Sequence, residues 1–63
     1  MCLSTIYKNE KADENILCKF VSSIKAEGDA LVFTDIMGTV TRIDGGRLVA
    51  ADLTAGTVII SAQ

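Results

Sequence analysis

The chain has 63 residues, with six Lys or Arg, eight Asp or Glu and no His, so its formal net charge is −2. This length fits one small domain, residues 1–63, and the acidic balance with scattered basic residues and only three aromatic rings disfavours nucleic-acid binding. The absence of histidine removes the usual base of nucleophilic catalysis, so we do not expect an enzyme.

Short segments rich in Val, Ile and Thr recur along the chain, with Gly and acidic residues between them at intervals of roughly eight to twelve residues, which is typical of strands. The predicted strands are residues 3–7, 16–19, 20–27, 30–34, 39–43, 47–53 and 57–61. A bend or bulge is expected between the second and third of them. We therefore predict an all-β fold, a small antiparallel barrel or a strongly curled sheet of six to seven short strands that pair consecutively.

Polar and glycine-containing segments predict the turns. The charged residues 8–15 follow the first strand, and Gly28 belongs to a tight turn because glycine accepts positive φ without a steric cost. Residues 35–38 and 54–56 turn the chain again, and Asp44-Gly45-Gly46 is the strongest hairpin signal. The two glycines lack the sequence context of a phosphate-binding loop.

Two aspartates, Asp35 and Asp52, stand near predicted strand ends. Their side chains are expected to cap turns through Asx hydrogen bonds. The alternative is that these aspartates bind a hard metal ion through their carboxylate oxygens. No other residue in the sequence supports such a site.

A domain of this size usually needs a disulfide, a structural metal or a partner subunit to be stable. Cys2 and Cys18 allow at most one bridge, and the chain has neither a secretory h-region nor an apolar run approaching the ~18 residues of a membrane span. We therefore expect a reducing cytoplasm, no membrane span and self-association. Val58-Ile59-Ile60, apolar on both faces, fits either a strand covered by a partner or a central strand packed within one chain.

Cys2 is the candidate metal ligand. If Met1 is removed, its thiol lies beside a free α-amino group, and thiolate, amine and backbone nitrogens then form a planar N,S donor set. Such a set suits Ni(II) or Cu(II) better than Mg(II) or Ca(II). From spacing alone, the competing interpretation is that Cys2 lies in a strand and fills the core as a small apolar residue.

Cys18 shares the parity of Ile16 and Phe20 on an apolar face, so core burial is expected. A site built from Cys2 and Cys18 would offer two thiolates, which do not complete the four-ligand shell of zinc in one chain. Two copies of the chain in a dimer would supply four thiolates.

The opening MCLSTIY, the central residues 29–38 and the closing GRLVAADLTAGTVII together resemble the CooT family. These are very short nickel-binding proteins linked to maturation of the nickel-containing carbon monoxide dehydrogenase. The resemblance covers nearly the whole chain, and the Met-Cys start is its distinctive mark. It implies a small β protein that forms a homodimer, with nickel binding dependent on Cys2; it implies nothing for Cys18.

The resemblance thus predicts a non-enzymatic nickel metallochaperone or sensor. It would bind Ni²⁺ transiently through Cys2 and act on a nickel enzyme such as carbon monoxide dehydrogenase or its maturation proteins. The alternative is a small β-barrel binding module without metal that recognises RNA or a protein partner.

Overall fold

The structure is a computed structural model that describes residues 3–62. Its strands are β1 (Ser4–Lys8), β2 (Ile16–Glu27), β3 (Ala30–Asp35), β4 (Val40–Asp44), β5 (Arg47–Asp52) and β6 (Thr57–Ser61). A single 3-10 turn, η1 (Asp13–Asn15), precedes β2. The all-β prediction is confirmed. Within residues 3–62, no helix is long and apolar enough to cross a membrane.

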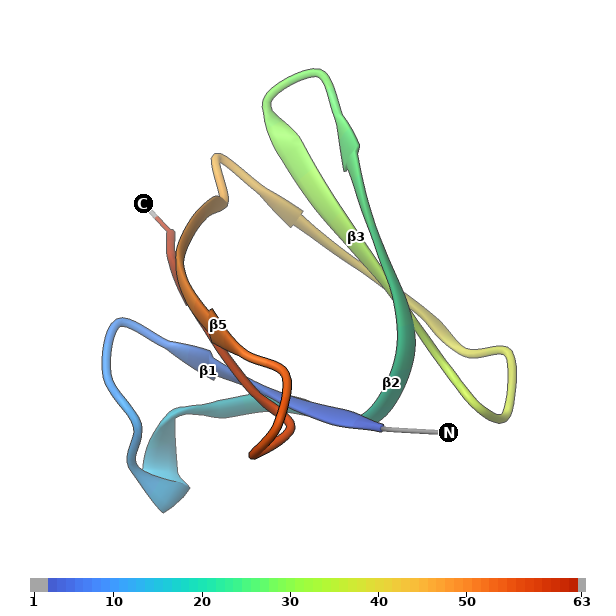
Figure 1. The fold of residues 1–63 in the computed structure, drawn as a ribbon. Coiled ribbons are helices and arrows are strands. Elements are labelled where there is room, and N and C mark those ends of the chain that lie inside the picture. Colours follow the sequence, from blue (N-terminus) through green and yellow to red (C-terminus); the bar gives the residue numbers. More distant parts are fainter. Residues whose placement is uncertain (1–2, 63) are drawn as a thin grey trace.

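The six strands form one curled sheet in the order β4-β3-β2-β1-β6-β5 (Figure 1). Strands β4 and β5 are the two edges, and no ladder joins them in the described part of the chain, so the sheet is strongly curled but open. Strand β6 pairs with β1 in parallel, from Thr5 opposite Thr57 to Lys8 opposite Ile60. The prediction that all strands pair consecutively and antiparallel is wrong at this ladder.

Residues 16–19 and 20–27 belong to one long strand, β2, which pairs with both β1 and β3. The predicted bend lies inside it, at Phe20, whose φ of 58° is in the left-handed region. Both ladders shift register around this point, between Ser4 and Ile6 on β1 and between Val21 and Ser23 on β2. Such bulges bend a strand sharply, and Figure 1 shows β2 curving from one half of the sheet into the other.

The hairpin predicted at residues 44–46 is wrong. Strands β4 and β5 lie on opposite edges of the sheet, so the segment between them crosses from one edge to the other. The consecutive antiparallel pairs that do form are β1 with β2, β2 with β3, β3 with β4 and β5 with β6.

The core is a cluster of side chains from both halves of the curled sheet. Its buried members are Ile6, Val21, Leu31, Phe33, Val58 and Ile60, and the partly buried Leu17, Cys18 and Ile43 pack against them. Strand β6 lies between β1 and β5, and its Val58 and Ile60 are buried in the chain's own core. Ile59 points to the opposite face and is half-buried. Burial of one face of β6 in the chain's own core is common to both alternatives for this strand, and the half-buried Ile59 is the side chain that distinguishes them.

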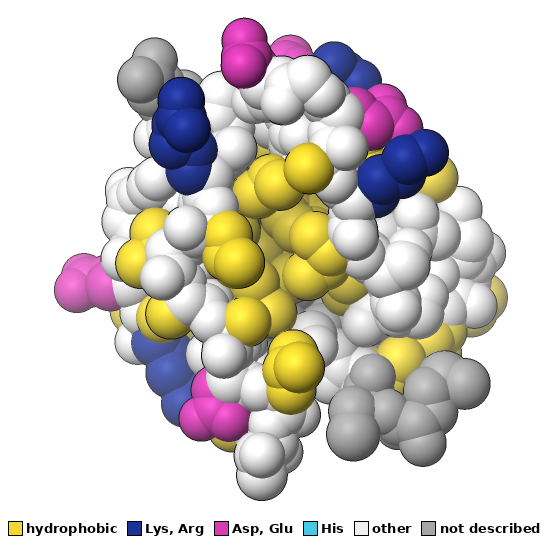
Figure 2. Space-filling view, turned by 45° about the horizontal axis from the view of Figure 1, so that its top comes forward, with side chains coloured by type: hydrophobic (Ala, Val, Ile, Leu, Met, Phe, Trp, Pro, Cys, Tyr) yellow, Lys and Arg dark blue, Asp and Glu magenta, His cyan; other side chains and the backbone are white. Residues whose placement is uncertain are grey.

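The core-facing side of the sheet is only partly covered. Cross-strand partners share a face, so Ile24, opposite the buried Phe33, and Leu48, opposite the buried Ile60, belong to this side. Yet Ile24 is 42% exposed and Leu48 60% exposed. Figure 2 shows hydrophobic side chains gathered in a hollow at the centre of one face, with charged groups at its margin. The single chain therefore leaves apolar surface open to water.

Candidate metal site

The predicted ligand Cys2 lies outside the described residues. The residues that follow it in the sequence, Ser4 and Thr5, are held by neighbours on two sides. Ser4 opens β1 and stands opposite Val21 of β2. On the other side, the backbone N–H of Thr5 donates a hydrogen bond of 2.8 Å to the carbonyl oxygen of Gly56, in the turn between β5 and β6. The start of the chain thus leaves the sheet between β2 and the β5–β6 turn.

A groove opens beside this point. Its volume is about 380 Å³, and it is lined by Ser4, Val21, Ser22, Ser23, Ile24 and Leu53. The Ser22 hydroxyl donates a hydrogen bond of 3.1 Å to the carbonyl oxygen of Thr34. The lining offers hydroxyl and aliphatic groups, without thiolate or carboxylate, so it does not supply the soft donors that Ni(II) prefers.

Cys18 is a free thiol whose side chain is half-buried against the core, opposite Ile6 in the β1–β2 ladder. Burial, and to a lesser extent the nearby Asp35 carboxylate, raises the pKa of the Cys18 thiol above its ordinary value. Because the thiolate is the form that binds metals, a raised pKa makes this sulfur a poor ligand at neutral pH. Its packing against the core agrees with the sequence expectation.

The two aspartates cap turns as predicted. Asp35 Oδ1 accepts hydrogen bonds from the backbone N–H groups of Met37 at 2.9 Å and Thr39 at 3.0 Å. Asp52 Oδ1 accepts one from Ala55 at 3.1 Å. Across residues 3–62, no group of three or more Cys, Asp or Glu side chains converges to hold a metal ion. The described residues therefore do not themselves form a coordination shell.

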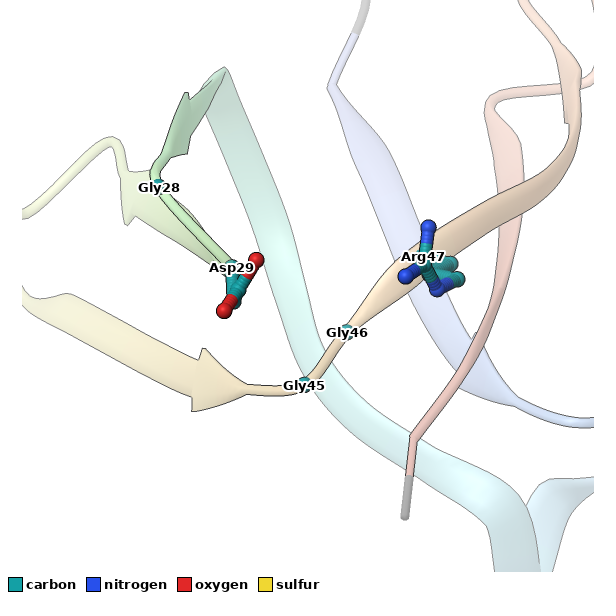
Figure 3. Close-up of a pocket in the computed structure, with 5 residues that line it drawn as sticks. All are labelled: Gly28, Asp29, Gly45, Gly46 and Arg47. Atoms are coloured by element: carbon teal, nitrogen blue, oxygen red, sulfur yellow. The ribbon is translucent and has the colours of Figure 1, made fainter.

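A second cavity, of about 230 Å³, lies between the β2–β3 turn and the segment that crosses from β4 to β5 (Figure 3). It is lined by Gly28, Asp29, Gly45, Gly46 and Arg47. Figure 3 shows Asp29 and Arg47 on either side of the view, with Gly45 and Gly46 between them. Sequence reasoning did not find this cavity, because it depends on two turns that are distant in the chain.

The donor set predicted from the sequence at Cys2, if formed, would suit a nickel ion in its chemistry. Thiolate sulfur and nitrogen donors favour square-planar Ni(II) over the oxygen-preferring cations. Ser4, two residues after the predicted ligand Cys2 in the sequence, lines the open groove and is itself only half-buried.

The comparisons with known proteins identify the family. A comparison with curated proteins gives no match. The family model described as CO dehydrogenase accessory protein CooT matches residues 1–61, which includes Cys2 and every strand of the sheet. Because the match spans nearly the full length, the chain belongs to the CooT family of CO dehydrogenase accessory proteins.

Proposed function

We propose that this protein is a nickel-binding accessory protein that delivers or senses nickel during carbon monoxide dehydrogenase maturation. The observation that carries the proposal is the family match over residues 1–61, which begins at the Met-Cys start. Nickel is the cargo and Cys2 its principal ligand. The protein acts in the cytoplasm without catalysing a reaction of its own.

The chemistry of capture and release follows from the donors. The thiol and the terminal amine must lose protons before they bind the ion, so nickel affinity falls as the pH drops. Burial raises the pKa of the Cys18 thiol, so less of this sulfur is present as the thiolate that binds metals.

A homodimer is part of the proposal. The exposed core-facing residues Ile24 and Leu48 are apolar surface that a second copy would cover. A twofold axis makes the two contact surfaces identical, so residues near the axis come in symmetric pairs. If the two chain starts meet at that axis, one ion takes donors from both copies of Cys2.

The direct test is isothermal titration of nickel into the intact chain, a Cys2→Ser variant and a Cys18→Ser variant. We expect Cys2→Ser to lose about 10-fold or more in affinity, since it removes the only proposed thiolate ligand. The Cys18→Ser variant is the matched control and should bind as the intact chain does. Undiminished binding by Cys2→Ser would refute the proposal.

The alternative is a binding module for a protein partner or RNA, without metal. The exposed apolar residues favour a protein over RNA, because the net charge of −2 repels phosphates. A chain that binds no nickel but forms a complex with a carbon monoxide dehydrogenase maturation protein would favour this alternative.

A further inference from the structure

The cavity of about 230 Å³ beside the β4–β5 crossing is lined largely by glycine backbone (Figure 3). A Cβ built on Gly28 or Gly45 would meet nothing within 4 Å, so the space in front of both residues is open. Backbone hydrogen bonds hold the crossing in place. The N–H of Gly45 donates to the carbonyl oxygen of Asp29 at 2.9 Å, and the N–H of Gly46 to that of Ile43 at 3.3 Å. The cavity is therefore a fixed feature of the fold.

Two opposite charges border this cavity without meeting. Asp29 lies in the β2–β3 turn and Arg47 begins β5, and Figure 3 shows Gly45 and Gly46 between the two side chains. Every ion pair found among residues 3–62 is formed by other side chains, so the carboxylate and the guanidinium are not paired there. Both side chains are exposed, so a ligand can reach them from the solvent.

From this arrangement we propose that the cavity binds a small zwitterion, a free α-amino acid, with its carboxylate on Arg47 and its ammonium group on Asp29. A guanidinium binds a carboxylate through two parallel hydrogen bonds, and a carboxylate accepts hydrogen bonds from an ammonium group. A simple anion is attracted by Arg47 but repelled by Asp29, and a simple cation meets the reverse. Only a ligand with both charges gains at both ends. This site is separate from the proposed function, since nickel is proposed to bind at Cys2.

The size and lining of the cavity limit the ligand. At about 30 Å³ for each water, a volume of about 230 Å³ holds roughly seven waters, which suits a molecule of about five to eight non-hydrogen atoms. Glycine and alanine fall in this range. Among the described residues, no aromatic or aliphatic side chain lines the cavity, so it offers nothing to a larger apolar ligand. Because exposed charges contribute little to binding, we expect dissociation constants in the millimolar range.

The experiment titrates the intact, metal-free chain with glycine, acetate or methylammonium at constant ionic strength, and follows the backbone amides of Gly45 and Gly46 by nuclear magnetic resonance. Metal-free protein is used because glycine itself chelates nickel. We expect glycine to shift these amide signals to saturation. Acetate and methylammonium should bind at least about 10-fold more weakly, since each lacks one of the two charge-assisted contacts. Acetate or methylammonium binding as tightly as glycine would overturn the zwitterion site, and so would the absence of a saturable shift with glycine.

Two pairs of variants assign the contacts. Arg47→Gln and Asp29→Asn each remove one charge and keep a polar side chain of similar size, and each should weaken glycine binding by about 10-fold. Arg42→Gln and Asp13→Asn are the matched controls, because they change the net charge equally at exposed positions that do not line the cavity. Both controls should bind glycine as the intact chain does. Equal weakening by the cavity variants and their controls would overturn the site, since glycine would then respond only to the overall charge.

Discussion

The backbone N–H of Gly45 donates a hydrogen bond of 2.9 Å to the carbonyl oxygen of Asp29. This bond ties the segment that crosses from β4 to β5 to the turn between β2 and β3. The next residue, Gly46, is buried at the crossing, where a Cβ would lie 3.2 Å from the Ile43 carbonyl oxygen and 3.3 Å from Ile43 Cγ2.

Replacing Gly46 with alanine should destabilise the fold, because the added methyl group overpacks this crossing. We expect a loss of about 1–3 kcal/mol in the free energy of unfolding, measured by urea denaturation. Thr54→Ala, in the exposed β5–β6 turn, should stay within about 0.5 kcal/mol of the original protein. Equal stability of the two variants would show that the crossing accommodates the added methyl group without overpacking.

The same crossing explains one failure of sequence reasoning. Asp44-Gly45-Gly46 has the local chemistry of a tight hairpin, but local chemistry does not determine which strands pair. The parallel β1–β6 ladder joins the first and last strands of the sheet and leaves β4 and β5 on opposite edges. By contrast, the caps at Asp35 and Asp52 were predictable, since each depends on amides within four residues.

The kink in β2 is a feature that sequence patterns predict poorly. Phe20 has a φ of 58° although it is neither glycine nor asparagine, and its side chain is 60% exposed. Left-handed backbone costs such a residue roughly 1–2 kcal/mol. The sequence suggested a bend at this position, and only the structure locates the strain in a single residue of one continuous strand.

Phe20→Gly is therefore expected to be neutral or to stabilise the fold by up to about 1 kcal/mol, since glycine adopts positive φ freely. At the neighbouring exposed position, Lys19→Gly should destabilise by about 0.5–1 kcal/mol, the usual cost of glycine inside a strand. Thermal unfolding of the two variants provides the comparison. A larger loss for Phe20→Gly than for Lys19→Gly would mean that the phenyl ring contributes more than the strain it imposes.

The proposed dimer predicts a difference between two equally exposed residues on opposite faces. Leu48 is 60% exposed on the core-facing side, and Val40, 61% exposed, lies on the other side of the sheet, because its neighbour Thr41 is the residue opposite the buried Phe33. Leu48→Glu should shift sedimentation equilibrium to the monomer, since a buried unpaired charge is costly. Val40→Glu should leave the dimer intact. Dissociation by both variants, or by neither, would argue against an interface on the core-facing side.

The environment of Cys18 predicts a pH dependence of stability. Because burial raises the thiol pKa, the folded chain keeps this proton to higher pH than the unfolded chain does. The free energy of unfolding should therefore be independent of this group below the ordinary thiol pKa and fall as the pH rises through the raised pKa. Urea unfolding from about pH 8 to pH 10.5 measures this slope.

The control for this measurement is Cys18→Ser, with Cys2→Ser present in both proteins so that only one thiol differs. The serine variant should lose the part of the slope that belongs to Cys18. An unchanged slope would show that the Cys18 proton is held equally in the folded and unfolded chains.

Cys2 was predicted as the metal ligand from its residue type and its place beside Met1, and it lies outside the described residues. For the next residue, Leu3, the structure shows that a Cβ at Gly56 would lie 2.8 Å from its carbonyl oxygen. Sequence patterns do not predict this approach, because it joins residues that are far apart in the chain.

The central claim, that the Cys2 sulfur binds nickel, is tested most directly by X-ray absorption at the nickel edge on the loaded protein with its native start. The account predicts sulfur in the first coordination shell and the edge features of a planar nitrogen and sulfur site, with the sulfur lost in Cys2→Ser and kept in Cys18→Ser. A first shell of oxygen and nitrogen alone in the intact chain would contradict it.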